Sequence, residues 1–294
     1  MRDETVRVPY RKPLSWEGVL GFFSFRATPG VEAVVDGRYC RTISTANGVG
    51  WLAAEPAGDG ASLAVTAHGV PPDDLSEVVR RVSVIFDVDA PIERIRRRLG
   101  ADAVLLPRLK RLPGVRVMGA WSGFELTVRA ILGQQISVAA ATTLAGRVAE
   151  RYGEPLSPPE AWSGLTRLFP TPARLARAHF NNMGLIGSRI ATIKAVSKAV
   201  AAGELSFHPD QDVTEFCDRF TAIKGIGDWT AQYVAMRVLR DPDAFPSSDL
   251  GLMKAVEPGT RLTPAELAAR AEHWRPWRAY AASLLWYGAA GSGG

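Results

Sequence analysis

The pattern of apolar and polar positions changes about one third of the way along the chain. Up to residue 90, short β-branched or aromatic runs alternate with Gly, Asn, Asp and Pro, which is typical of strands joined by turns. The strand-like runs cover residues 21–27, 31–45, 48–56 and 61–70. Helical spacing occurs over residues 16–25, which overlap the first run, and over residues 72–86. Residues 1–90 are therefore predicted to form an antiparallel sheet with helices.

From about residue 91 the apolar residues recur with a helical period, and strand signals disappear. Ser122 stands three residues before Glu125, the spacing of a capping box, and Ser137 is placed to cap the helix that follows it. Near the C-terminus, the sequence Thr-Pro-Ala-Glu at 263–266 supplies a cap, a first-turn proline and a capping-box partner together. The rest of the chain is therefore predicted to be nearly all helix.

One proline-rich segment, residues 157–172, interrupts this helical pattern. Prolines favour turns and extended connections. The segment also contains Trp162, Leu165, Leu168 and Phe169, which give it apolar surface to bury. We therefore expect a surface connection that packs on the fold, and not a disordered linker.

Composition narrows the class of protein. With 294 residues, 47% of them hydrophobic, the chain can bury more than one core, which favours two or three domains. Its 35 Lys and Arg against 30 Asp and Glu give a net charge of +5, which suits a polyanionic partner without requiring one. Cys40 and Cys217 are far apart and belong to no C-x-x-C pair, which excludes a structural zinc site and a four-cysteine iron–sulfur cluster.

The sequence carries no sign of membrane insertion. No apolar leader follows the charged N-terminus, and no stretch approaches the roughly 20 apolar residues of a membrane span. We therefore expect a protein that works in the reducing cytoplasm.

Two glycines separate a pair of predicted helices at Gly225-Ile226-Gly227. The dinucleotide fingerprint and the P-loop are excluded here, because each needs a preceding strand and a longer glycine pattern. One interpretation is a hairpin whose second helix presents free N–H groups to an anion such as a DNA phosphate. The other is a tight turn between core helices, with Gly225 ending the first. Asp228 suits the helix dipole but would lie close to a bound phosphate, so its role stays open.

The motifs around this turn resemble those of the helix-hairpin-helix (HhH-GPD) DNA glycosylases. FTAIKGIGDWTAQYVAMR, followed about twenty residues later by FPSSDLGLMKAV, is similar to the family's hairpin and aspartate loop. FELTVRAILGQQISVAAATTLAGRVAERYG resembles its central helix pair, and HWRPWRAYAASLLWY its closing helices. The order and spacing match over almost the whole chain, and the branch that removes alkylated bases such as 3-methyladenine is the most similar.

The resemblance implies an α+β multidomain fold. An N-terminal antiparallel α+β domain, residues 1–90, would precede a mostly α-helical HhH-GPD glycosylase core of two helical subdomains. Residues 91–120 and 240–290 would form the subdomain that carries the catalytic aspartate. Residues 121–239 would form the other and end in the helix-hairpin-helix, with the active-site cleft between the two.

Asp249 follows FPSS and precedes a short predicted helix. Taken alone, this position indicates a helix N-cap. The resemblance implies that Asp249 is the catalytic group, since its carboxylate would stabilise an oxocarbenium-like sugar, or orient water, while the bond between base and deoxyribose breaks. A helix N-terminus would favour the negative charge that this role needs.

Trp229 and Tyr233 are four residues apart and therefore share one helix face, a pattern that by itself is most often core. The resemblance places both on the wall of a pocket for a flipped base, together with Trp286 and Phe22. A ring-alkylated purine is cationic and gains a cation–π contribution of about 0.5–2 kcal/mol over such rings. Family members that also cleave the strand carry a lysine where Trp229 stands, so a monofunctional enzyme that leaves an abasic site is predicted.

The residues expected to contact DNA fall in two segments: Lys224, Gly225, Ile226, Gly227 and Thr230 around the hairpin, and Gln134, Gln135 and Ile136 in the loop at 133–137. Taken alone, this loop is a helix-helix turn capped by Ser137. The resemblance implies that one of its side chains fills the gap left by the flipped nucleotide. Wedge residues are commonly apolar, so both Gln135 and Ile136 stay open as the wedge.

The resulting hypothesis is a monomeric, monofunctional DNA glycosylase of base excision repair that removes alkylated purines from double-stranded DNA at the nucleoid. No cofactor and no side-chain metal site are expected, although the family hairpin can hold a structural cation through backbone carbonyls. Two alternatives stay open: a non-catalytic HhH DNA-binding protein, and a sister glycosylase for oxidised or mismatched bases. A helical scaffold for protein partners would explain the helices but not the order of the motifs.

Overall fold

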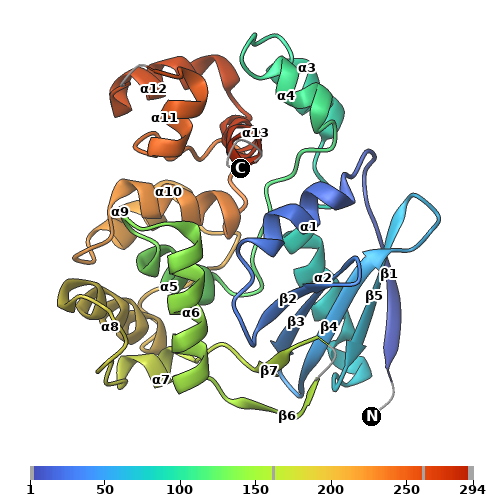
Figure 1. Cartoon of the computed structure of the whole chain (residues 1–294), viewed down its shortest axis with the longest axis vertical. Helices are drawn as coiled ribbons and strands as arrows, with labels where there is room; N and C mark the ends of the chain where they lie inside the picture. The colour runs from blue at the N-terminus through green and yellow to red at the C-terminus, as the bar shows by residue number, and fades with distance from the viewer. Residues whose placement is uncertain (1–2, 161–162, 260–261, 291–294) are drawn as a thin grey trace.

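The computed structural model describes residues 3–160, 163–259 and 262–290 (Figure 1). Its N-terminal part is built on an antiparallel sheet of five strands in the order β1-β5-β4-β3-β2. The strands are β1 (Glu4–Pro9), β2 (Glu32–Val35), β3 (Arg38–Ser44), β4 (Val49–Pro56) and β5 (Ser62–His68). The predicted antiparallel α+β domain is thus confirmed.

Two helices, α1 (Trp16–Ser24) and α2 (Leu75–Phe86), cover one face of this sheet. A single 3-10 turn, η1 (Pro72–Asp74), leads into α2. Phe23 of α1 packs against Tyr39 of the sheet and Phe86 of α2, with ring centroids 4.3 and 6.1 Å apart. Of the two overlapping predictions for residues 16–27, the helix is therefore correct and the strand is wrong, because helical spacing places the apolar side chains of α1 on one buried face.

A short hairpin packs on the opposite face of the sheet. It consists of β6 (Pro155–Glu160) and β7 (Leu165–Arg167), so the prediction that strands disappear after residue 91 is wrong. Leu165 is fully buried against Cys40 and Trp51. The proline-rich segment thus packs on the fold as predicted, although it does so as strands; Trp162 lies outside the described residues.

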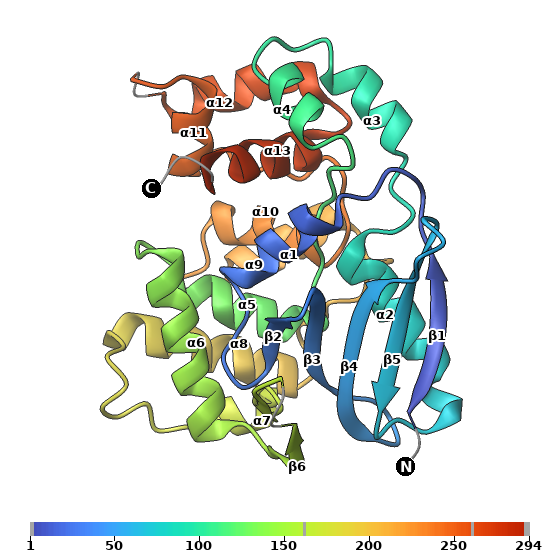
Figure 2. The same cartoon turned by 45° about the vertical axis from the view of Figure 1, so that its right-hand side comes forward.

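Eleven further α-helices follow in the described part of the chain: α3 (Ile92–Leu99), α4 (Leu106–Arg111), α5 (Gly123–Leu132), α6 (Val138–Tyr152), α7 (Pro172–Ala176), α8 (Gly187–Ala201), α9 (Val213–Thr221), α10 (Asp228–Arg237), α11 (Leu250–Val256), α12 (Pro264–Ala271) and α13 (Arg278–Ala290). A 3-10 turn, η2 (Glu272–Trp274), separates the last two. In Figures 1 and 2, α3 and α4 lie with α11, α12 and α13 at one end of the molecule, and α5 to α10 lie below them. Among the described residues, none of these helices is long and apolar enough to cross a bilayer.

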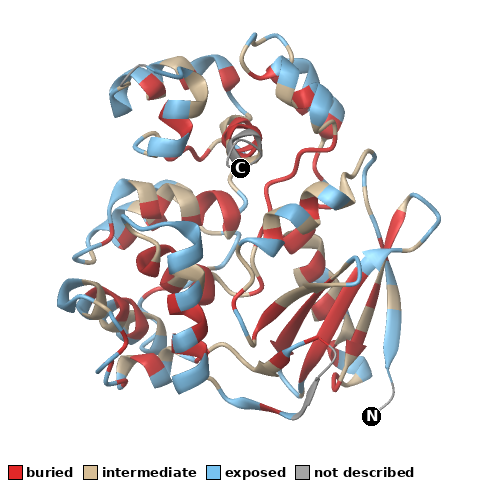
Figure 3. Cartoon of the chain, viewed as in Figure 1, coloured by how far each residue is buried: buried red, intermediate tan, exposed pale blue. Residues whose placement is uncertain are grey.

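The predicted helix starts are found where the sequence places them. The Thr263 and Glu266 side chains form a complete capping box, and Ser137 accepts a hydrogen bond from the amide of Ala140 (3.2 Å). The Ser122 hydroxyl accepts a hydrogen bond from the amide of Glu125 (3.3 Å), but the Glu125 carboxylate accepts none from the Ser122 amide, so the capping box is incomplete. Figure 3 shows the buried residues concentrated where these helices face one another.

The Glu125 carboxylate instead joins a buried cluster of four charges that links the sheet to α5. Glu32 and Arg41 come from β2 and β3, and Glu125 and Arg129 from α5. Arg41 donates to Glu125 (2.8 Å) and to Glu32 (3.3 Å), while Arg129 donates to the same two carboxylates at 3.4 and 2.7 Å. The Tyr39 hydroxyl adds a donor to Glu32 at 2.6 Å. Two positive and two negative charges therefore balance within one dry junction, which is the condition under which buried ions are tolerated.

Replacing one acid of this cluster should be costly. Glu32→Gln leaves two buried guanidinium groups to share the Glu125 carboxylate, so we expect the free energy of unfolding to fall by about 3–5 kcal/mol. Burial alone would raise the pKa of Glu32, but Arg129 and Arg41 lower it overall. The stabilisation is therefore complete above the ordinary glutamate pKa of about 4.3 and is lost as the pH falls below that.

Urea denaturation at neutral pH measures this loss. The matched control is Glu77→Gln, which breaks a partly exposed pair with Arg80 and Arg81 at the surface and should cost about 1 kcal/mol or less. Equal effects of the two substitutions would show that the buried cluster does not hold the sheet to α5.

Candidate active site

Asp249 is the N-cap of α11, and its carboxylate accepts three hydrogen bonds. The amide of Leu252 (2.8 Å) and the indole Nε1 of Trp286 (3.1 Å) donate to Oδ1, and the indole Nε1 of Trp229 (2.8 Å) donates to Oδ2. A carboxylate offers about four lone-pair sites, two on each oxygen. Oδ1 is therefore saturated by protein donors, whereas Oδ2 keeps one lone pair for a group outside the described chain.

Two of the four predicted pocket aromatics, Trp229 and Trp286, thus hold the carboxylate directly. A third, Tyr233, extends the aromatic surface beside them. Tyr233 stacks on Trp229 with ring centroids 5.0 Å apart and planes at 10°. It also meets Trp286 edge-on at 6.0 Å. Trp229 and Tyr233 come from α10 and Trp286 from α13, so the hairpin helix and the last helix enclose Asp249 between them.

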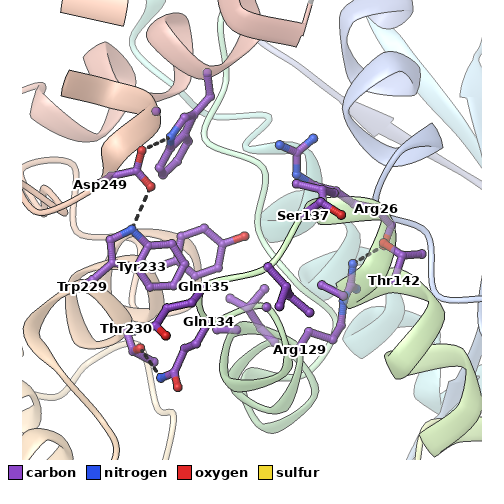
Figure 4. A pocket seen from close by; sticks show the side chains of 18 of the residues that line it. Arg26, Arg129, Gln134, Gln135, Ser137, Thr142, Trp229, Thr230, Tyr233 and Asp249 are labelled. Atoms are coloured by element: carbon purple, nitrogen blue, oxygen red, sulfur yellow. Dashed lines mark hydrogen bonds between the residues drawn. The ribbon is translucent and has the colours of Figure 1, made fainter. Parts of the chain in front are cut away.

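These aromatics line a cavity of about 970 Å³ that also contains Asp249 and Phe22. The structure therefore brings together all four predicted pocket aromatics and the predicted catalytic group, from α1, α10, α11 and α13. Figure 4 shows Asp249 and Trp229 on one side of the cavity and Arg26, Arg129 and Thr142 on the other. The volume and the apolar walls are those of a site for a small organic group such as a base.

Three arginines that the sequence interpretation missed also line the cavity: Arg26, Arg129 and Arg237. The Arg26 and Arg237 guanidinium carbons lie 4.3 and 5.0 Å from the ring centroid of Phe22. Arg237 also lies 5.1 Å from the ring centroid of Tyr233 and donates a hydrogen bond to its hydroxyl. Phe22 and Arg26, like Tyr233 and Arg237, are four residues apart. This spacing is the sequence pattern that could have predicted the contacts between these arginines and rings.

The arginines change the chemistry of Tyr233. Burial alone would raise the pKa of its phenol, but Arg237, Arg26 and Arg129 stabilise the phenolate and lower the pKa overall. Because an Arg237 N–H donates to the phenol oxygen, the phenol proton is left to point elsewhere.

The hairpin between α9 and α10 uses its two glycines differently. Gly225 has a φ of +93°, and a Cβ there would meet the Thr192 hydroxyl at 2.0 Å, so only glycine fits. A Cβ at Gly227 would meet nothing within 4 Å. Gly227 also caps α10 without a side-chain hydrogen bond, so the first amides of that helix have no side-chain acceptor. Ile226 is buried between the glycines, and Lys224 is exposed.

The loop at 133–137 is tied to this hairpin. The Gln134 amide donates to the carbonyl of Gly225 (3.1 Å) and to the hydroxyl of Thr230 (3.4 Å), and Arg189 donates to the Gln134 carbonyl (2.6 Å). Thr230 is 2% exposed, which favours a role in joining loop and hairpin over direct contact with a phosphate. Gln135 follows this anchor with a φ of +58° and is exposed.

The hairpin carbonyls that could hold a cation already have protein donors. The Lys224 carbonyl accepts a hydrogen bond from the Thr192 hydroxyl (3.1 Å), and the Gly225 carbonyl accepts one from the Gln134 side-chain amide. Each of these carbonyls keeps a second lone pair, so the structural cation stays a prediction. Across the described residues, no three His, Cys, Asp or Glu side chains gather as metal ligands. Asp228 is exposed in the first turn of α10, where it suits the helix dipole.

Comparison with known proteins decides the family. Residues 5–122 match the AlkA N-terminal domain, and residues 128–278 match the HhH-GPD superfamily of base excision DNA repair proteins. The chain belongs to the HhH-GPD superfamily. Both the predicted family and the predicted fold class are therefore confirmed.

Two curated HhH-GPD relatives cover nearly the whole chain. The "Probable bifunctional transcriptional activator/DNA repair enzyme AlkA" of Mycobacterium tuberculosis is 36% identical over 96% of this chain, which spans only 56% of that protein. "DNA-3-methyladenine glycosylase 2" of Escherichia coli is 33% identical, with 95% of each chain covered. The first name describes a DNA repair enzyme, and the second a DNA glycosylase.

Solved HhH-GPD structures share the fold. The 3-methyladenine DNA glycosylase from Archaeoglobus fulgidus superposes with a TM-score of 0.84 at 23% identity, covering 97% of this chain and 98% of that one. An 8-oxoguanine glycosylase/lyase of Clostridium acetobutylicum, solved with double-stranded DNA, has a TM-score of 0.73 at 16% identity, with 94% and 91% covered. Since these two proteins are named for different lesions, the fold alone does not identify the base.

The arginine environment of Tyr233 gives a direct spectroscopic prediction. Burial raises the pKa of Tyr39, Tyr280 and Tyr287, whereas the pKa of Tyr233 is lowered. An absorbance titration should therefore show a phenol that ionises below the ordinary value of about 10 and that disappears in Tyr233→Phe. Tyr152→Phe, far from the cavity, serves as the control and should keep it. If the phenol that ionises below about pH 10 also disappeared in Tyr152→Phe, the assignment to Tyr233 would be rejected.

Proposed function

We propose that this chain is a monofunctional DNA glycosylase that hydrolyses the N-glycosidic bond of alkylated purines in duplex DNA, after flipping the damaged nucleotide, and leaves an abasic site. The observation that carries the proposal is the Asp249 carboxylate, held by two indole N–H groups at the wall of an aromatic cavity. The names of the DNA-3-methyladenine glycosylase relatives support the same substrate class.

The geometry around Asp249 suits a dissociative bond cleavage. As the base leaves, positive charge develops on the sugar, and a fixed carboxylate nearby stabilises that charge without having to reorganise. The indoles of Trp229 and Trp286 hold the carboxylate in one orientation. The free lone pair of Oδ2 then accepts a hydrogen bond from the attacking water, or faces the sugar directly.

Asp249→Asn tests this role. The amide keeps the size of the side chain and its cap to Leu252 but removes the negative charge. We expect unchanged folding and DNA binding, with single-turnover release of methylated base reduced by at least about a hundredfold, the scale of one preorganised electrostatic contact.

The control is Asp59→Asn, an acid of an exposed pair far from the cavity, which should release base at the wild-type rate. Undiminished release by Asp249→Asn would remove Asp249 from the mechanism. Failure of the wild-type chain to release any base would instead favour the non-catalytic DNA-binding alternative.

The hairpin side chain next to the carboxylate supports hydrolysis without strand cleavage. Strand cleavage by this superfamily uses an amine that attacks the sugar, whereas here the indole of Trp229 occupies that place and donates to Asp249. Borohydride reduction during turnover should therefore trap no covalent protein–DNA adduct. A known bifunctional glycosylase, run alongside, controls for the reductant. A trapped adduct with this chain would show a Schiff base and overturn the proposal.

The electrostatics of the cavity favour broad lesion selectivity. Phe22 and Tyr233 already carry guanidinium groups on their rings, so Trp229 and Trp286 are the rings left for a cationic base. Arg26 and Arg237 have no carboxylate partner among the described residues and oppose a second cation, whereas Asp249 attracts it. Cation–π discrimination is thus small, and the weak glycosidic bond of the alkylated base itself provides most of the selectivity.

The loop at 133–137 favours Gln135 as the wedge that replaces the flipped nucleotide. The neighbouring Gln134 is anchored by the hairpin and by Arg189, which fixes the backbone on one side of Gln135. Gln135 has a left-handed backbone conformation, is exposed at the cavity, and has no hydrogen-bond partner within the described chain. Its amide suits the donors and acceptors of the base left without a partner.

Truncating the wedge should slow extrusion and leave the chemistry intact. We expect Gln135→Ala to slow base release from a paired duplex several-fold, with a smaller defect when the lesion is mismatched, because unpairing then costs less. Ile136→Ala is the matched variant, and a larger defect there would assign the wedge to Ile136.

The proposed function also includes an oligomeric state and a location. We propose a monomer that scans double-stranded DNA at the nucleoid in the cytoplasm, with Lys224 and the free amides of α10 on the DNA backbone. Sedimentation velocity of the chain with and without duplex DNA distinguishes a 1:1 complex from a dimer.

A further inference from the structure

Residues 91–112 form a short, strongly basic segment of the chain. The whole chain has 35 basic and 30 acidic side chains, a net charge of +5. Residues 91–112 contain seven of the basic residues and two of the acidic ones, which is also a net +5. The other residues sum to 28 basic and 28 acidic, although unevenly: residues 161–203 carry six basic side chains and no acidic one. The seven basic residues of the 91–112 segment all lie in α3 and α4.

Six side chains of these two helices form an exposed surface that we call the basic patch: Arg94, Arg96, Arg97, Arg98, Lys110 and Arg111. None of the six pairs with a carboxylate in the part of the chain that the structure describes; Arg98 donates to the carbonyl of Arg275 (2.8 Å). Of the two acids in the segment, Asp102 is already held by Arg270 (2.5 Å) and Trp274 (2.8 Å). The basic patch is thus not neutralised within the described chain.

Helix stability does not explain the basic patch. α3 buries Ile92, Ile95 and Leu99, and its solvent face carries arginines at i, i+3 and i+4, a spacing at which like charges repel. The arginines of the last turn gain from the helix dipole, but Arg94 lies in the first turn, where a positive charge opposes it. A charge arrangement that the helix itself disfavours indicates an anionic partner.

The helices of the basic patch pack on the same group of helices as Asp249. Arg108 of α4 donates to the carbonyl of Ala255 in α11 (3.0 Å), and α4 also packs on α13. Ala255 is six residues after Asp249, about 9 Å along the helix axis. Figures 1 and 2 show α3 and α4 at the same end as α11 and α13. One turn of duplex DNA is about 34 Å long, so a duplex centred on Asp249 has backbone within reach of the basic patch.

We propose that the basic patch binds the phosphate backbone of the duplex beside the lesion and extends the DNA contact beyond the hairpin. This inference rests on the proposed function for the position of the DNA. An acidic protein segment would also match the charge, but the closeness of α4 to the Asp249 helix favours the molecule that must bring its damaged base to Asp249. Backbone contacts of this kind add affinity and no sequence preference.

The salt dependence of DNA binding tests the proposal with the full chain. The probe is a duplex of about three helical turns, undamaged or with a stable abasic analogue at its centre. The variant Arg94→Gln/Arg97→Gln/Arg111→Gln removes three charges, so the slope of log Kd against log salt should fall by about 2 to 3, since each phosphate contact contributes about 0.9.

The matched control is Arg7→Gln/Arg11→Gln/Arg80→Gln, which removes the same charge from exposed positions of the N-terminal domain and should leave the slope unchanged. Lys224→Gln, at the hairpin, should lower the slope by about 0.9. Base release should be unaffected in the control triple variant, because it alters neither the cavity nor the basic patch.

An unchanged slope in the patch variant, or an equal fall in the control, would overturn the proposal, and an unchanged slope would leave an acidic protein segment as the partner to test. The two proposals can fail separately. If the wild-type chain releases no methylated base while the patch variant still lowers the slope, the glycosylase function fails and the DNA contact stands.

Discussion

The buried cluster of Glu32, Arg41, Glu125 and Arg129 is the interaction on which the rest of the structure depends. It joins the sheet to α5 through four ions that are acceptable in a dry junction only as a complete set. Arg129 belongs both to this cluster and to the cavity wall, and it also holds the carbonyl of Arg26. Through that contact the junction fixes the chain that leaves α1, and α1 carries Phe22.

The cavity is consequently assembled from parts that are distant in sequence. Asp249 caps a short helix, the indoles that orient it come from α10 and α13, and the opposite wall comes from α1 and α5. Each contribution has an ordinary structural reason, such as a cap, a stacked pair or an arginine over a ring. Their convergence on one carboxylate distinguishes this candidate site from a hydrophobic core.

Much of the fold, and the residues that meet at the candidate site, could be predicted from the sequence, since period, caps and motif spacing are local properties. Asp249, Trp229 and Tyr233 lie within two such motifs. The charge cluster could not be predicted, because a single sequence does not show which of many arginines meets Glu32 ninety-seven residues away. The β6 strand was missed because its three prolines suppress the strand signal, although an irregular edge strand tolerates them.

The position of Phe22 has a consequence for the dielectric environment of the reaction. The N-terminal domain contributes the ring of Phe22 and the side chain of Arg26 to the cavity wall, and Arg237 of α10 also lies over that ring. Such a wall displaces water, and a charge acts more strongly where fewer water dipoles screen it. In the proposed hydrolysis, the sheet domain would therefore reduce the bulk water that screens Asp249 while leaving room for the attacking water.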